Sequence, residues 1–133
     1  MLTSVIRAII FDLDGTLVHS LSGIAKALNT ILEHHQLPTH SQSTVRTFIG
    51  DGIVKLVERA CPDGYDPGQM AELTGEVSNE YATAWRDGTV PYTGVNETLT
   101  ALLQSGTKIA VLSNKPHAFC QQITDLIFPD ITF

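Results

Sequence analysis

A short apolar run near the start of the chain, Val5–Phe11, ends in two carboxylates, Asp12 and Asp14. The run is rich in isoleucine and carries a single charge, Arg7. This pattern is typical of a strand that is buried on both faces in a parallel sheet. Because carboxylates are costly to bury, we expect them at the carboxyl end of that strand. Open α/β sheets bind their ligands at this edge.

The two acids have a chemical use at such an edge. Asp12 can attack phosphorus as a covalent nucleophile, and Asp14 can protonate the leaving oxygen and then activate water. Acids this close repel each other unless a cation lies between them, and Mg²⁺ binds both carboxylate and phosphate oxygens. Gly15 permits a tight turn, and Thr16 can bind the backbone of that turn. The alternative interpretation is an acidic turn without a catalytic role. The full string Ile9–Leu17 is much more specific than two acids alone and argues against that alternative.

Helical periodicity governs the middle of the chain. Apolar residues recur at helical spacing over Leu21–Leu32, Ile53–Ala60 and Met70–Trp85, which predicts three helices. A shorter helix is expected over Thr44–Ile49. Residues 20–87 are therefore predicted to form an all-helical insert.

Helix and strand alternate again after the insert. We expect a helix over Glu97–Gln104 with Gly106 as its C-cap, and a second apolar strand over Lys108–Leu112. Pro116 suits the first turn of a further helix, and Phe128–Phe133 has the pattern of a third strand. This alternation predicts a parallel sheet with right-handed crossovers.

The predicted fold class is therefore α/β, a partial Rossmann-like parallel sheet with an inserted helical cap. Residues 1–19 and 88–133 are assigned to the sheet portion and residues 20–87 to the cap. A chain of 133 residues is long enough for one such domain with a small insert.

The second predicted strand also ends in polar residues, Ser113 and Asn114. If the two strands are neighbours, about 4.8 Å apart, Ser113 stands beside Asp12. A hydroxyl and a helix-start amide there can hold phosphoryl oxygens. The same two residues can equally cap the following helix, and spacing alone does not decide between these interpretations.

The insert offers two candidate substrate contacts, Arg46 and the loop that begins at Gly50. A cap loop that closes over a phosphate excludes water, which favours the chemistry. A plain helix–helix turn beside a surface arginine is an equally good interpretation of the same residues.

Composition narrows the classes of partner. The formal charge of −6, from 8 basic and 14 acidic residues, argues against an electrostatic nucleic-acid binder. No apolar run approaches the roughly 20 residues that span a membrane. The two cysteines, Cys61 and Cys120, have no Cys-x-x-Cys partner, which favours free thiols in a reducing cytoplasm.

Several segments resemble the haloacid dehalogenase superfamily of phosphatases. The string at residues 9–17 resembles motif one of that superfamily. Residues 89–99, 102–106 and 109–116 resemble phosphoglycolate phosphatases in particular, and residues 46–52 resemble their cap domain.

The resemblance implies hydrolysis of a small phosphomonoester, such as phosphoglycolate, through an aspartyl-phosphate with Mg²⁺. It makes Asp12 the nucleophile, Asp14 the acid–base residue, and both of them metal ligands. Ser113 and Asn114 then form motif two, whose hydroxyl binds the phosphoryl group, and Thr16 joins Arg46 and Gly50 as a substrate contact.

The third and fourth motifs of the superfamily have no match in the chain. Lys115 belongs to the Asn-Lys-Pro segment that follows motif two, so we do not assign to it the role of the phosphoryl-binding lysine of the superfamily. Asp125 and Asp130 lack the glycine-flanked context of the late acidic pair. We therefore expect a fragment or a shortened relative, with impaired activity and weak Mg²⁺ binding.

An open first strand would pair with another chain, so a homodimer through an exposed sheet edge is expected. The alternatives to a phosphatase are a non-catalytic binding or assembly module and a related mutase or dehalogenase. By resemblance, retention of both Asp12 and Asp14 favours hydrolysis over dehalogenation.

Overall fold

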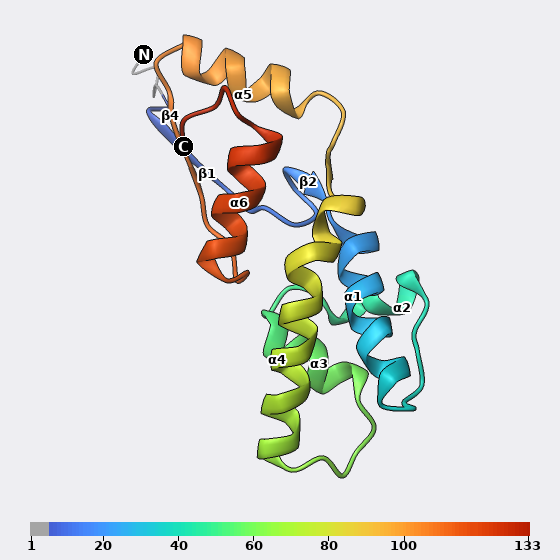
Figure 1. Cartoon of the computed structure of the whole chain (residues 1–133). Helices are drawn as coiled ribbons and strands as arrows, with labels where there is room; N and C mark the ends of the chain where they lie inside the picture. Colours follow the sequence, from blue (N-terminus) through green and yellow to red (C-terminus); the bar gives the residue numbers. More distant parts are fainter. Residues whose placement is uncertain (1–5) are drawn as a thin grey trace. The chain divides into compact units, whose positions relative to one another are not determined.

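The computed structural model describes residues 6–133, so Val5 lies outside the described residues. Contacts divide the chain into two compact units, which are described separately (Figure 1). The core unit consists of the residues up to His19, Val90–Ser113 and His117–Phe133. The helical unit consists of Ser20–Thr89 and Asn114–Pro116. The division differs from the boundaries predicted from the sequence in placing residues 88–89 and 114–116 with the helices.

The core unit contains the predicted parallel strand pair. Strand β1 (Ala8–Phe11) pairs in parallel with β4 (Lys108–Val111), with Ala8 opposite Lys108 and Phe11 opposite Val111. A short antiparallel pair, β2 (Val18–His19) with β3 (Val90–Pro91), follows the first turn. Helix α5 (Val95–Gln104) precedes β4, and helix α6 (His117–Ile127) follows it. The predicted alternation of helix and strand is therefore confirmed.

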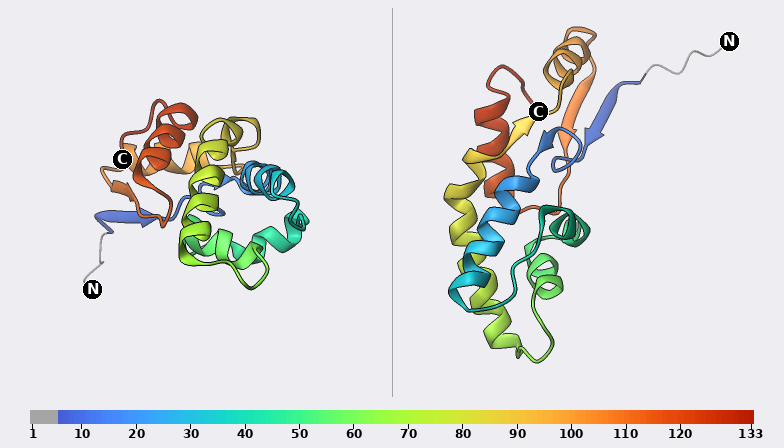
Figure 2. Two further views of the ribbon diagram at one scale, coloured as in Figure 1. Left: turned by 60° about the horizontal axis from the view of Figure 1, so that its bottom comes forward. Right: turned by 90° about the vertical axis from the view of Figure 1, so that its right-hand side faces the viewer.

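Only one face of the β1–β4 pair is covered by the described residues. Helix α6 lies on one side of the two strands (Figure 2). Ile109, on the covered face, is only 6% exposed, whereas Ile10 of β1 is 66% exposed. The prediction that the first strand is buried on both faces is wrong, because an apolar run does not itself supply a second layer of helices.

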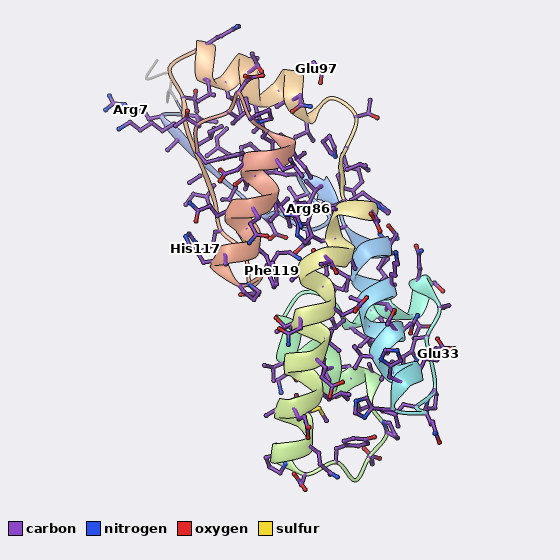
Figure 3. The ribbon with its side chains drawn as sticks, viewed as in Figure 1. Arg7, Glu33, Arg86, Glu97, His117 and Phe119 are labelled. Carbon is purple, nitrogen blue, oxygen red and sulfur yellow. The ribbon has the colours of Figure 1, made fainter. Side chains whose placement is uncertain are left out.

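The predicted third strand is also wrong. Residues 128–133 form a turn in which the amide of Ile131 donates to the carbonyl of Phe128 at 3.0 Å. Phe128 is 1% exposed and its ring meets that of Phe133 edge-on, 6.0 Å between centroids. Pro129 lacks the amide hydrogen that a sheet ladder needs, and the aromatic rings here fill the core from a turn. Pro116 lies directly before α6, whose first turn carries His117 and Phe119 (Figure 3).

The helical unit contains all four helices expected from the sequence: α1 (Leu21–His34), α2 (Gln42–Phe48), α3 (Ile53–Ala60) and α4 (Pro67–Ala84), with a final 3₁₀ turn, η1 (Trp85–Asp87). Helix α4 packs against both α1 and α3, and α2 packs against α1 and α3. The apolar stripes of the sequence form this core, in which Leu28, Leu32, Leu73 and Trp85 are at most 2% exposed.

Helix α1 ends in a two-bond cap. The amide of Leu37 donates to the carbonyl of Leu32 at 2.8 Å, and the amide of Gln36 donates to Glu33 at 3.0 Å. This is the Schellman arrangement, and it places Gln36 at a φ of +56°. Helix α5 ends in the same way, with the predicted glycine, Gly106, in the left-handed position.

Candidate active site

The turn after β1 is wound around Leu13. This side chain is fully buried, and its carbonyl accepts hydrogen bonds from the amides of Thr16 (3.2 Å), Leu17 (3.0 Å) and Val18 (3.1 Å). Gly15 has a φ of +80°, which favours glycine, and its amide donates to Val18 at 2.9 Å. Thr16 thus contributes to the turn through its backbone amide.

The two acids flank Leu13. Asp12 is exposed and Asp14 is half-buried. The inward position of Leu13 leaves its neighbours at the surface of the core unit, at the carboxyl end of β1. The sequence therefore predicted this placement of the acids from the strand and the turn alone.

Ser113 lies at the same edge of the sheet. The ladder continues beyond the strand ends, since the amide of Leu112 donates to the carbonyl of Phe11 at 2.8 Å. This register places Leu112 level with Asp12 and half-buried Ser113 one residue further along. The strands are neighbours, as the sequence predicted, and the core unit brings Asp12, Asp14 and Ser113 to one edge.

A pocket of about 220 Å³ opens beside the turn. Thr16 and Leu17 line one part of it, and Thr93, Val95 and Leu99 line another at the start of α5. It is mostly apolar and smaller than most small-molecule sites, which start at about 300 Å³. Thr16 faces this pocket and is exposed.

Asn114 and Lys115 belong to the helical unit and bind other residues of it. The Asn114 side-chain amide donates to the carbonyl of Gly50 at 2.6 Å. The Lys115 ammonium donates to the Tyr81 hydroxyl at 2.7 Å and lies 4.3 Å from the centre of its ring. Lys115 is thus bound to an aromatic side chain of α4.

The loop between α2 and α3 carries the other candidate residues. Arg46 is exposed in the last turn of α2. The loop is held by Arg59, whose guanidinium donates to the carbonyl of Phe48 at 3.0 Å and forms an ion pair with Asp51. The sequence predicts Tyr81 as a core residue of the insert, and Tyr81 is buried. Its contact with Lys115 and the role of Arg59 were missed, because nothing in the local pattern marks a core tyrosine or a surface arginine as a partner for a distant segment.

The donor set at the acidic edge fits Mg²⁺ only in part. Among residues 6–133 there is no group of three or more His, Cys, Asp or Glu side chains that could hold a metal. Asp12 and Asp14 supply hard oxygen donors, and Mg²⁺ is commonly held by one or two carboxylates with water and substrate phosphate completing its shell. The residues present fit that incomplete type of site.

Comparison with known proteins identifies the family. Residues 9–127 match the model of the haloacid dehalogenase-like hydrolases. The chain belongs to this family. The resemblance seen in the sequence is therefore confirmed, and it extends over nearly the whole chain.

The similar curated proteins are about twice as long. The chain is 39% identical over 117 residues to the phosphoglycolate phosphatase of Pectobacterium atrosepticum, which covers 86% of this chain and 50% of that protein. It is 36% identical over 124 residues to the corresponding protein of Pseudomonas syringae pv. tomato, covering 90% of this chain and 45% of the relative. The chain thus spans about half the length of the curated relatives it matches.

Solved structures show the same fold. A predicted phosphoglycolate phosphatase from Haemophilus somnus superimposes with a TM-score of 0.82 at 32% identity, over 91% of this chain and 57% of that one. A predicted phosphatase from Clostridium acetobutylicum gives a TM-score of 0.81 at 23% identity, over 92% and 56% of the two chains, and supports the fold alone. Within the described residues, no helix is both long and apolar enough to cross a membrane.

Proposed function

We propose that this chain provides the nucleophile, the acid–base residue and a phosphate-binding hydroxyl of a cytoplasmic phosphatase for small phosphomonoesters of the phosphoglycolate type. The observation that carries the proposal is the joint position of Asp12, Asp14 and Ser113 at the carboxyl edge of the β1–β4 pair. Relatives bearing the name phosphoglycolate phosphatase support the substrate class.

The first half-reaction forms an aspartyl-phosphate. A carboxylate oxygen of Asp12 attacks phosphorus while the bond from phosphorus to the alcohol oxygen breaks. Asp14, in its protonated form, gives its proton to that leaving oxygen. Asp14 is half-buried and lies two residues after Asp12, in the turn that the hydrogen bonds to the Leu13 carbonyl fix.

The second half-reaction restores the enzyme. Asp14, now a carboxylate, removes a proton from water, and the resulting oxygen attacks phosphorus while the bond to Asp12 breaks. Ser113 donates a hydrogen bond to a phosphoryl oxygen in both halves, and the amide at Asn114 can contribute another. Bound Mg²⁺, held by the carboxylate of Asp12 and the backbone carbonyl of Asp14, would neutralise negative charge on the phosphoryl group.

We further propose that the helical unit acts as the cap. Arg46 is exposed and therefore available to a phosphate or carboxylate group of a substrate. The adjacent loop turns at Gly50, with a φ of +131°, and at Gly52, with a φ of +87°. These two positions give the loop a shape that other residues rarely adopt.

Phosphate release from a panel of small phosphomonoesters, with Mg²⁺ present, tests the proposal. The Asp12→Asn variant should lose at least about 10²–10³-fold in turnover, because an amide is a poor nucleophile. Asp125→Asn removes an equally charged, exposed carboxylate on α6 and should retain wild-type activity. Equal turnover by wild type and Asp12→Asn would refute the assignment of the nucleophile.

The Asp14→Asn variant separates the two half-reactions. After an acid quench, mass spectrometry should find a phosphoryl group on the Asp12 peptide of this variant, because attack can precede the blocked hydrolysis. Absence of turnover and of this adduct in every form would favour the other candidate, a non-catalytic binding or assembly module. That candidate draws support from the small set of metal donors among the described residues.

A further inference from the structure

Aspartate is followed directly by glycine at four places in the chain, Asp14, Asp51, Asp63 and Asp87. Such an Asp-Gly site is chemically labile, because glycine has no side chain to shield its amide nitrogen from the neighbouring carboxyl group. The nitrogen gives up its proton and bonds to the carboxyl carbon, and the carboxyl hydroxyl leaves with that proton as water. Water then opens either carbonyl of the resulting succinimide ring, which yields aspartate or isoaspartate. One water leaves and one enters, so the isomerisation needs no other reactant.

The folded structure decides how easily each site reacts. The carboxyl group must turn onto the amide nitrogen, so a cation that holds the carboxylate elsewhere opposes the reaction. The amide nitrogen must be able to approach the carboxyl carbon, so a hydrogen bond from that amide to a carbonyl opposes the reaction as well. Either contact has to open locally before the ring can form.

Ion pairs restrain two of the four sites. The carboxylate of Asp51 binds the guanidinium of Arg59, and the carboxylate of Asp87 lies 3.1 Å from the ammonium of Lys26. The amide of Gly88 is also engaged, since it donates to a carbonyl of the preceding turn at 3.4 Å. At both sites the carboxylate must leave its cation before it can reach the amide nitrogen.

A hydrogen bond restrains the site at Asp14. The amide of Gly15 donates to the carbonyl of Val18 at 2.9 Å, within the turn that is wound around the carbonyl of Leu13. The nitrogen that would have to attack is therefore fixed by the backbone of this turn.

The fourth site lies in the loop between α3 and α4 of the helical unit (Figure 1). Asp63 and Gly64 form a turn there, and both are exposed. Among residues 6–133, neither the Asp63 carboxylate nor the Gly64 amide has a hydrogen-bond or ion-pair partner. Gly64 has a φ of +106°, and apart from its chain neighbours no atom lies within 4 Å of the position that a β-carbon would take. No contact has to open before the carboxyl group of Asp63 reaches the amide.

We propose that Asp63 is a site of spontaneous isomerisation to isoaspartate in the folded chain. Isoaspartate at this position lengthens the backbone by one carbon in the loop that leads into α4. That helix begins with a capping box, in which the side chains of Asp66 and Gln69 each accept the backbone amide of the other, at 2.9 and 3.0 Å. The modified chain is a substrate for carboxyl methyltransferases that recognise isoaspartate. The proposal does not depend on phosphatase activity.

Prolonged incubation of the full chain under native conditions, followed by digestion and peptide mapping, tests the proposal. Isoaspartate in each Asp-Gly peptide is measured by enzymatic methylation of its free α-carboxyl group. The same incubation in denaturant gives the rate of each site without structure, so the ratio of the two rates is the protection of that site.

Asp63 should be the least protected of the four sites, by about two- to tenfold, since opening an exposed ion pair or a hydrogen bond slows a reaction by roughly that factor. Protection at Asp63 that equals or exceeds that of any other Asp-Gly site would overturn the proposal.

Two variants test the physical reason. Asp63→Glu keeps the charge but would require a six-membered ring, so methylation of that peptide should disappear; methylation that persists there would refute the assignment. Arg59→Gln removes the ion pair of Asp51 and should raise the rate at Asp51 towards its value in denaturant, while the rate at Asp63 stays the same. Far-UV circular dichroism confirms that each variant keeps its helices. An unchanged rate at Asp51 in the folded Arg59→Gln variant would overturn the shielding on which the ranking of the sites rests.

Discussion

Replacing Gln36 with glycine should stabilise the helical unit. Gln36 occupies the left-handed position after α1, with a φ of +56°, and its side chain is exposed. The amides of Gln36 and Leu37 close the helix through bonds of 3.0 and 2.8 Å to Glu33 and Leu32. The Gln36→Gly change keeps both backbone bonds and removes only the β-carbon that disfavours this conformation.

The gain can be estimated from two opposing terms. A non-glycine residue pays about 1–2 kcal/mol in the left-handed region. Glycine gives back about 0.5–1 kcal/mol, because its unfolded chain is more flexible. The expected net increase in unfolding free energy is about 0.5–1 kcal/mol, which corresponds to a rise in Tm of roughly 2–5 °C for a chain of this size.

Thermal unfolding followed by circular dichroism at 222 nm measures this change, since most of the signal comes from helices. Gln36→Ala keeps the β-carbon and should leave the Tm nearly unchanged. Glu33→Gly, in the last turn of the same helix (Figure 3), should lower stability by about 1 kcal/mol. A Tm for Gln36→Gly at or below that of wild type would refute the reasoning.

Three further predictions concern packing, reactivity and metal binding. Gly88→Ala should destabilise the chain by about 1–3 kcal/mol, because the new β-carbon would lie 2.2 Å from the Ser22 hydroxyl and 2.9 Å from the Gly23 amide nitrogen. Denaturant unfolding measures this change, and an unchanged midpoint would contradict the prediction. Burial raises the pKa of the Cys61 thiol, so in a Cys120→Ser background its disulfide-exchange rate at pH 8 should be lower than that of a free cysteine and should still climb above pH 9. Calorimetry should show Mg²⁺ binding in the millimolar range or weaker, and tight stoichiometric binding would reveal a ligand that has not been recognised.

Local sequence patterns predicted the helices well because the same residues build the core. The periodic leucines of α1 and α4, such as Leu28 and Leu73, are buried where the two helices meet. The observed helix boundaries differ from the predicted ones where a capping side chain sets the first residue of the helix. Helix α2 begins two residues before the predicted Thr44, because the Ser41 hydroxyl accepts the Thr44 amide at 3.2 Å and starts the helix.

Burial of a strand is less predictable, because it depends on what the rest of the chain places against it. The isoleucines of β1 have the composition of a central strand, yet Ile10 is two-thirds exposed. The opposite mistake occurs at Phe128, which is buried as expected but lies in a turn and not in the predicted third strand. A buried aromatic residue in a turn has the same local pattern as one in a strand.

The candidate site likewise contains residues that the local sequence places and contacts that it does not predict. Asp12 and Asp14 follow directly from the strand and turn around them, so one segment of sequence was enough to place them. The partners of Asn114 and Lys115, by contrast, lie 64 and 34 residues away. Contacts at such separations leave no mark in a single sequence, so they become visible only in the folded chain.

The contacts of Asn114–Pro116 bear on how the helical unit can be transplanted. A gene segment encoding only Ser20–Thr89 would include all of its helices but would lack the side chains that bind Gly50 and the Tyr81 hydroxyl. Exchange of the helical unit between relatives, in the laboratory or by recombination, would therefore have to carry two separate stretches of sequence. The residues after β4 and those of the helices are consequently expected to have been inherited together.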